Sequence, residues 1–378
     1  GEMVCEISDD GRGRGAFRYA SEYLRTSGAF ALDPVSLPLR EGEFNIEHPG
    51  IFGVFEDSLP DDWGRRLLVR KHRLPLHQQN LPNLLLALGS AGLGALSYAE
   101  KALAQPTSAE APVLYLDQLA KAAEAFERGD KSDADINLLL GAGSSPGGAR
   151  PKALVYDEQA DQHYLAKFPS IKDQVDVVRI EAATMKLAEK AGLDVPETKL
   201  VECGSRPVLM VKRFDVLPQG RRHMVSLQTL LKVTGYYQAR YADMLNVTRK
   251  VSADPLLDSE RLFRQMVFNA VIHNTDDHLK NFWMTCTRDE GWRLSPAFDL
   301  VPDIGQRGEP VLFFDLDPVY PGRENLLRLG RSWGVSGATE IIEQVFNAVS
   351  YWREAYLACG VALKDIERFK EIDDYLNR

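Results

Sequence analysis

The stretch His273-Asn-Thr-Asp-Asp-His-Leu-Lys-Asn281 consists mainly of polar residues and follows a regular apolar segment of this sequence almost directly. In that segment, residues 262–271, apolar side chains recur at the spacing of one helix face. The spacing predicts a buried helix that ends where the polar run begins. Because so many polar and charged groups follow a buried helix end, we interpret the run as a functional loop.

Within this loop, Asp276 and Asn281 have the D-x-x-x-x-N spacing of a kinase catalytic loop. There the Asp accepts or orients a substrate hydroxyl, and the Asn holds a metal ion. A further carboxylate, Asp299, is flanked by apolar residues, so we expect it at a buried strand end as a Mg²⁺ ligand. A lone Asp is more often a helix or turn cap. The three residues together, in this order, favour phosphoryl transfer.

A metal-dependent hydrolase is the minor alternative for the same loop. His273, Asp276, Asp277 and His278 are all possible metal ligands. They lie in one short segment, however, and the sequence identifies no distant ligand to complete a site.

An ion pair between a strand and a helix is expected upstream. Residues 162–168 alternate like a strand that sets Lys167 on the same face as Leu165. In the helix expected at about 174–190, Glu181 lies beside an apolar stripe. Buried charges are tolerated mainly in pairs, so we expect Lys167 and Glu181 to meet, as in protein kinases. Otherwise, Lys167 extends to solvent and Glu181 lies on the helix shoulder.

A glycine- and serine-rich loop, residues 141–148, precedes that strand. It is not a Walker A loop, because Ala149 stands where Gly-Lys-Ser/Thr would follow. It also departs from the kinase glycine loop, since Pro146 occupies the third glycine position. The loop is therefore either a flexible turn or a phosphate cradle, with Lys152 nearby as a positive charge.

The order of expected elements is strands with one prominent helix, followed by helices from residue 226 onward. This order predicts an α+β fold. We expect two lobes like those of a protein kinase, the first mixed β/α and the second all-α, with an N-terminal subdomain. The expected boundaries are 1–110 for the subdomain, 111–216 for the first lobe with the lysine, and 217–378 for the helical lobe with the catalytic loop.

Composition excludes several classes of protein. Hydrophobic residues make up 44% and charged residues 26% of 378, which disfavours disorder and coiled coil. The net charge of −9 disfavours direct binding to nucleic acid. The four cysteines form no CxxC pair, which argues against zinc and for a reducing compartment. Without an apolar span or a secretion signal, we expect a cytoplasmic protein with no membrane contact.

With these features in place, the sequence resembles the HipA family, serine/threonine kinase toxins of bacterial toxin–antitoxin modules. Its most specific match is Asn274-Thr-Asp-Asp-His-Leu-Lys-Asn281. The other matching stretches are residues 94–98, 145–154, 165–169, 211–215, 268–270 and 297–302.

The resemblance implies a role for each matching residue. Asp276 would be the catalytic base, and Asn281 and Asp299 the magnesium ligands. Ser145, or Ser144 beside it, would be autophosphorylated, which silences the kinase. Lys167 would hold the ATP phosphates, and Glu181 would be its structural partner. The full set of residues expected to contact ATP is Gly147, Gly148, Ala149, Arg150, Pro151, Lys152, Lys167, Lys212, Arg213, Phe214, His278, Lys280, Asn281, Phe298 and Asp299.

The resemblance also implies partners. ATP and Mg²⁺ would serve transfer to a protein substrate, an aminoacyl-tRNA synthetase in the family's pattern, with a role in persistence. A small HipB-like DNA-binding antitoxin would bring the chain to DNA indirectly. Two alternatives are open: a small-molecule kinase of aminoglycoside-phosphotransferase type, and a non-catalytic co-repressor that bridges antitoxin dimers.

Overall fold

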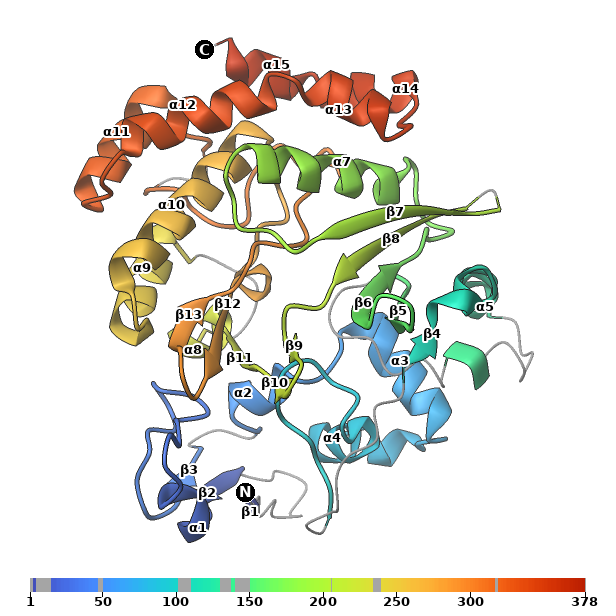
Figure 1. Cartoon of the computed structure of the whole chain (residues 1–378), viewed down its shortest axis with the longest axis vertical. Coiled ribbons are helices and arrows are strands. Elements are labelled where there is room, and N and C mark those ends of the chain that lie inside the picture. The colour runs from blue at the N-terminus through green and yellow to red at the C-terminus, as the bar shows by residue number, and fades with distance from the viewer. Residues whose placement is uncertain are drawn as a thin grey trace. The chain divides into compact units, whose positions relative to one another are not determined.

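The computed structural model describes residues 3–4, 15–46, 50–100, 110–129, 137–139, 150–204, 206–233, 239–316 and 319–377 (Figure 1). The chain folds into two compact units, each assembled from separated stretches. The first unit comprises Gly1–Ala166, Asp215–Lys232 and Thr285–Gly291, and the second Lys167–Phe214, Val233–Met284 and Trp292–Arg378. The division at 110 and 216 into contiguous segments stays a prediction.

The first unit contains short strands and helices around an aromatic core. Phe17 packs edge-on against Tyr19 and also contacts Phe44 and Phe55. Its elements are β1 (Met3–Val4), β2 (Ala16–Tyr19), α1 (Ser21–Leu24), β3 (Phe44–Asn45), α2 (Gly53–Glu56), α3 (Asp62–Lys71), η1 (Leu76–Gln78), α4 (Leu81–Leu88), β4 (Ala111–Pro112), η2 (Val113–Tyr115), α5 (Leu116–Arg128), β5 (Lys152–Asp157), β6 (Gln162–Lys167), β9 (Val216–Leu217), β10 (Gly220–Arg221), β11 (His223–Ser226) and α8 (Leu227–Leu231). Lys167, the last residue of β6, opens the second unit.

The second unit is mainly helical. Its elements are α7 (Val177–Lys190), β7 (Thr198–Cys203), β8 (Arg206–Lys212), α9 (Tyr241–Val251), α10 (Pro255–Val271), η3 (Leu279–Asn281), α11 (Arg323–Ser332), α12 (Ala338–Val349), α13 (Trp352–Ala358), α14 (Leu363–Ile366), η4 (Glu367–Phe369) and α15 (Glu371–Leu376). Within the described part of the chain, no helix combines the length and apolar character that crossing a membrane requires.

Helix α7 packs against the β7–β8 hairpin (Figure 1). The two strands are antiparallel, with Thr198 opposite Val211. Val178 and Ala182 of the helix form a buried cluster with Leu209 and Val211 of the hairpin. The side chain of Asp176 caps the helix by accepting from the Arg179 amide at 3.0 Å. This packing confirms the expected helix and fixes the axis from which Glu181 projects.

Helix α10 is the buried centre of the second unit, with α9 and α12 packed against it (Figure 1). The predicted stripe is confirmed, because every member is fully buried: Leu262, Phe263, Met266, Val267, Ala270 and Val271. The helix ends at Val271, and the amide of Asn274 then donates to the carbonyl of Asn269 at 2.9 Å. The polar loop therefore starts from a rigid helix end.

The expectation that residues 217–378 are all helical is wrong. Strands β10 and β11 lie in this range, as do β12 (Trp283–Thr287) and β13 (Gly291–Leu294), which are neighbours in a sheet. Trp, Thr and Cys in β12 suit a pleated surface, and β13 alternates in burial. Gly291 adopts φ +67°, which closes the turn between them. The observed class is mixed α/β.

Candidate active site

Lys167 joins two carboxylates from distant parts of the second unit. Its Nζ forms the predicted ion pair with Glu181 and lies 2.7 Å from Asp299 Oδ1. The side chains of Lys167 and Glu181 are only 12% and 6% exposed. Burial by itself lowers the pKa of Lys167, but the charges of Asp299 and Glu181 outweigh it and hold that pKa above its ordinary value. Lys167 is therefore a fixed cation held by two acids.

Asp299 is not at a strand end, which corrects the sequence expectation. Strand β13 ends at Leu294, and Asp299 lies in a connecting segment with φ +58°. This left-handed conformation costs about 1 kcal/mol for a residue other than glycine. The backbone before it is anchored, because the Ala297 amide donates to the Asp194 carbonyl at 2.7 Å. The side chain is 40% exposed, so the carboxylate that meets Lys167 is also open to a ligand.

A hydrogen bond joins the two ends of the D-x-x-x-x-N segment in the structure. The side-chain amide of Asn281 donates to the carbonyl of Asp276 at 2.9 Å, and η3 tightens the chain between them. That bond uses Nδ2 of Asn281 and leaves Oδ1, a ligand atom suited to Mg²⁺, outside it. The Asp276 side chain is 53% exposed, so its carboxylate is accessible to a substrate.

Asp303, four residues after Asp299, connects this segment to the Asp276–Asn281 loop. Its Oδ1 accepts from Thr275 Oγ1 at 2.8 Å and from the Arg307 amide at 2.9 Å. Its Oδ2 accepts from the Gly308 amide at 2.8 Å. This turn holds Arg307, whose Nη1 lies 3.3 Å from Asp276 Oδ1. The Asp299 segment and the Asp276 loop are thus one hydrogen-bonded structure.

Sequence reasoning missed Thr275, Asp303 and Arg307 as parts of this site. The only local signal was an aspartate followed by glycines, which is typical of a turn closed by its own side chain. Nothing in the sequence indicates that the turn lies against Asp276, since that contact joins residues 31 positions apart.

Residues 212–214, expected among the ATP contacts, begin at the last residue of strand β8. The Phe214 ring lies 5.9 Å from that of Phe298, the neighbour of Asp299. The Lys212 amide donates to the Glu197 carbonyl at 2.9 Å, and Arg213 is buried. The structure therefore brings the 212–214 segment to the residue that precedes Asp299.

The remaining site residues expected from the sequence fall into three groups. Arg150, Pro151 and Lys152 belong to the first unit, where Lys152 starts β5. His278 directly precedes η3 and Lys280 lies within it, and the Lys280 carbonyl accepts from Trp283 Nε1 at 2.6 Å. Four predicted residues, with the alternative Ser144, lie outside the described residues: Ser145, Gly147, Gly148 and Ala149.

The donor set suits magnesium better than zinc. Asp299 and Asn281 offer the hard oxygen ligands that Mg²⁺ prefers. Among the described residues, three or more His, Cys, Asp or Glu side chains do not gather into a metal cluster. The minor reading of the loop as a His-rich hydrolase centre therefore gains no support.

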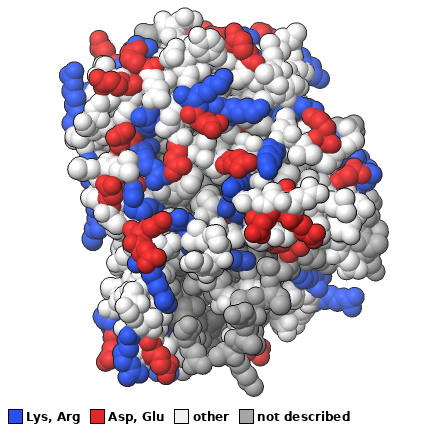
Figure 2. All heavy atoms as spheres, viewed as in Figure 1, with Lys and Arg blue, Asp and Glu red and all other residues white. Residues whose placement is uncertain are grey.

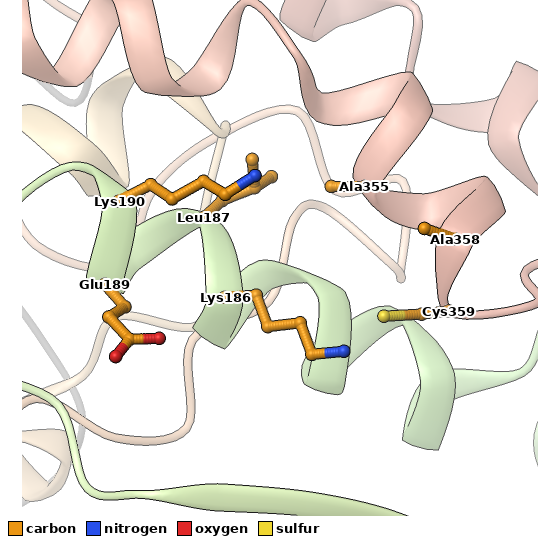
Figure 3. A pocket seen from close by; sticks show the side chains of 7 residues that line it. All are labelled: Lys186, Leu187, Glu189, Lys190, Ala355, Ala358 and Cys359. Carbon is orange, nitrogen blue, oxygen red and sulfur yellow. The ribbon is translucent and has the colours of Figure 1, made fainter.

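A surface pocket of about 360 Å³ lies elsewhere in the second unit, between α7 and α13 (Figure 3). Lys186 and Lys190 project from α7 toward it, and Cys359 closes the α13 side. None of the residues expected to contact ATP lines it. The pocket is thus separate from the candidate active site, although both use α7.

Charged side chains on the second unit are intermixed rather than segregated. In Figure 2, basic and acidic side chains lie next to each other over the upper part of the view, which holds α11–α15. Ion pairs on these helices include Arg353 with Asp373 at 2.7 Å and Arg323 with Glu343 at 2.6 Å. This part of the surface lacks the one-sided positive charge that favours phosphate backbones.

Comparison with known proteins gives matches over most of the chain. The sequence model of the HipA-like C-terminal domain matches residues 144–352, and that of the HipA N-terminal domain matches residues 1–99. A candidate kinase of Sinorhizobium fredii (strain NBRC 101917 / NGR234), Y4mE, is 28% identical over 335 residues, 80% of this chain and 76% of Y4mE. A second, Y4dM, is 28% identical over 154 residues, 37% of each chain.

A solved structure shows the same fold. The HipA of the Shewanella oneidensis MR-1 toxin–antitoxin system, solved with HipB and its operator DNA, superposes with a TM-score of 0.70. The match covers 99% of this chain and 95% of that one at 18% identity. At this identity the likeness concerns the fold alone.

Proposed function

Because this chain belongs to the HipA family, we propose that it is a serine/threonine protein kinase toxin that uses ATP and Mg²⁺. The observation that carries the proposal is Lys167 held by both Glu181 and Asp299, in the unit that also contains the closed Asp276–Asn281 loop. A lysine paired in this way and an Asp five residues before an Asn are the parts that phosphoryl transfer requires.

Each residue then has one task. Glu181 keeps Lys167 in place, and Lys167 binds the phosphates of ATP. Asn281 and Asp299 would hold Mg²⁺, which when bound neutralises negative charge on the phosphates. Asp276 accepts the proton of the attacking hydroxyl. Arg307, which contacts Asp276 Oδ1, competes with the attacking hydroxyl for this carboxylate.

The arrangement of the chain fits this proposal. The two lobes of a kinase would correspond to the β-rich region around Lys167 and the helical region around α10, preceded by the N-terminal HipA domain. Among the described cysteines, Cys286 and Cys359 are free thiols, which suits a reducing cytoplasm. A HipB-like antitoxin would supply the contact with operator DNA, because this chain carries a net charge of −9.

The protein itself is the first substrate to test. We expect Mg·ATP alone to add one phosphate to Ser145, which intact-mass and peptide mass spectrometry detect. Asp276→Ala abolishes the addition, because the general base is lost. Asp289→Ala is the matched control, since Asp289 is an exposed aspartate on the β12–β13 turn; this variant is modified like wild type.

The alternatives give different results. Turnover of a hydroxylated small molecule without any self-modification would identify a small-molecule kinase. Antitoxin binding by wild type and Asp276→Ala alike, with no ATP turnover by either, would identify a co-repressor. Growth arrest on expression that disappears with Asp276→Ala would support the toxin role, and phosphoproteomics of the two strains would identify the protein substrate.

A further inference from the structure

A chain of four hydrogen bonds, three buried and one partly buried, starts and ends at neighbouring residues of the catalytic loop. The Asp276 amide donates to Asn274 Oδ1 at 2.9 Å, and Asn274 Nδ2 donates to Asn269 Oδ1 at 3.1 Å. Asn269 Nδ2 donates to the Tyr241 hydroxyl at 3.0 Å, and that hydroxyl donates to Asp277 Oδ2 at 2.8 Å. The peptide bond between Asp276 and Asp277 closes the circuit, which we call the loop ring.

The loop ring has one direction. Both amide side chains donate on one side and accept on the other, so neither can flip without two donors or two acceptors facing each other. The ring ends in a carboxylate, which only accepts when ionised. Its four side chains are at most 2% exposed, so water cannot replace a lost bond at low cost.

Each member is also held from outside the ring. The Tyr241 ring stacks on Phe314 at 5.1 Å and meets Phe282 edge-on at 5.8 Å. The Asn274 carbonyl accepts from the Tyr320 hydroxyl at 3.0 Å. Tyr241 is the first residue of α9, and Asn269 lies in the last turn of α10. The ring therefore connects two packed helices to the peptide that carries Asp276.

We propose that Tyr241, Asn269 and Asp277 are positioning residues for Asp276. Acting through Asn274, they fix the peptide planes on both sides of Asp276 and so direct its exposed carboxylate, although none of them meets the substrate. Asp277 has no place among the residues that contact ATP or metal, and its burial beside the exposed Asp276 is explained by this role. The consequence for turnover rests on the proposed function; the effect on the loop does not.

The test compares two matched tyrosine variants. Tyr241→Phe deletes the hydroxyl that links Asn269 to Asp277. Tyr356→Phe makes the same change at an equally buried tyrosine of the same unit. The Tyr356 hydroxyl lies 2.8 Å from Thr184 Oγ1, and neither residue is a neighbour in sequence of a member of the loop ring. Amide hydrogen exchange of peptides covering residues 273–282 and turnover of Mg·ATP alone are measured for both, with thermal melting to check folding.

We expect Tyr241→Phe to speed exchange in residues 273–282 and to lower kcat for ATP turnover, each by about tenfold or more, with KM for ATP unchanged within about threefold. Tyr356→Phe leaves loop exchange and kcat as in wild type, even where its melting temperature falls. Asn269→Ala reproduces the Tyr241→Phe pattern. The variant that combines both substitutions shows no larger change in loop exchange or kcat than the more affected single variant, because the ring acts as one unit.

Equal loop exchange in Tyr241→Phe and Tyr356→Phe overturns the proposal, as does additive loss in the double variant. A wild-type protein that turns over no ATP would count against the proposed function alone. In that case the hydrogen-exchange comparison still decides whether the ring positions the loop.

Discussion

Lys167 Nζ lies 2.7 Å from Asp299 Oδ1, although 132 residues separate them in sequence. Together with the Glu181 ion pair, this contact holds a buried ammonium group between two carboxylates. One carboxylate is buried and belongs to a helix, whereas the other is partly exposed and lies in a strained segment. Under the proposed function, the buried acid is the fixed support and the exposed acid would hold the metal ion.

Lys167→Met should separate the structural role of the pair from its chemical role. It leaves Glu181 buried without its lysine, so the free energy of unfolding falls by about 3 kcal/mol. Adding Glu181→Met removes the stranded charge and restores stability to within about 1 kcal/mol of wild type. Urea unfolding measures both effects. ATP turnover stays at least about 100-fold down in both variants; recovery of turnover in the double variant would show that Lys167 is only structural.

Removing Arg307 should speed turnover. Arg307 and Asp276 are both more than half exposed, so their ion pair contributes less than about 1 kcal/mol to stability. Arg307→Ala frees the base and raises ATP turnover about two- to fivefold, with unfolding unchanged. Raising the salt concentration screens the pair and has the same effect on wild type. Arg323→Ala, which breaks an exposed pair between Arg323 of α11 and Glu343 of α12, is the control. A slower Arg307→Ala enzyme would instead assign Arg307 to the reaction.

The protonation of Asp277 should make stability depend on pH. Burial raises the pKa of Asp277 to about 7, although hydrogen bonds from Tyr241 and from backbone amides lower that pKa in part. Its folded-state pKa exceeds the unfolded value near 4, so its stabilising contribution is full below pH 4 and is lost between pH 4 and 7. We expect wild type to lose up to roughly 1.4 kcal/mol per pH unit relative to Asp277→Asn in that window. Parallel stability curves for the two proteins would contradict the shift.

The end of α7 offers a test of the scaffold that carries Glu181. Gly192 has φ +78°, and a Cβ there would lie 2.8 Å from Gln344 Nε2 and 2.9 Å from Arg264 Nη1. Gly334 has φ +61° with open space around it. Gly334→Ala should therefore lose about 1 kcal/mol from backbone strain alone. Gly192→Ala should lose about 1 kcal/mol more, because Arg264 must give up its bonds to Gln344 and Ala191. Equal losses in thermal unfolding would show that the side chains yield freely.

Residue spacing within short segments predicted two helices and one ion pair of the fold. The α10 stripe and α7 follow from helical spacing. The Lys167–Glu181 pair follows from the high cost of burying an unpaired charge. The conformation of Asp299 did not follow, because apolar neighbours indicate burial and carry no information about a positive φ. Strands β12 and β13 were missed beside the stronger helical signal, and neither the ring nor the Arg307 contact could be read from residues so far apart in sequence.

The most direct test of the central claim is ADP formation from Mg·ATP by Asp276→Asn. We predict a loss of at least about 100-fold in turnover with the affinity for Mg·ADP unchanged, because the base acts on the hydroxyl and not on nucleotide binding. Asp289→Asn should match wild type in both measurements. Full turnover by Asp276→Asn would contradict the assignment of this loop as the site of phosphoryl transfer.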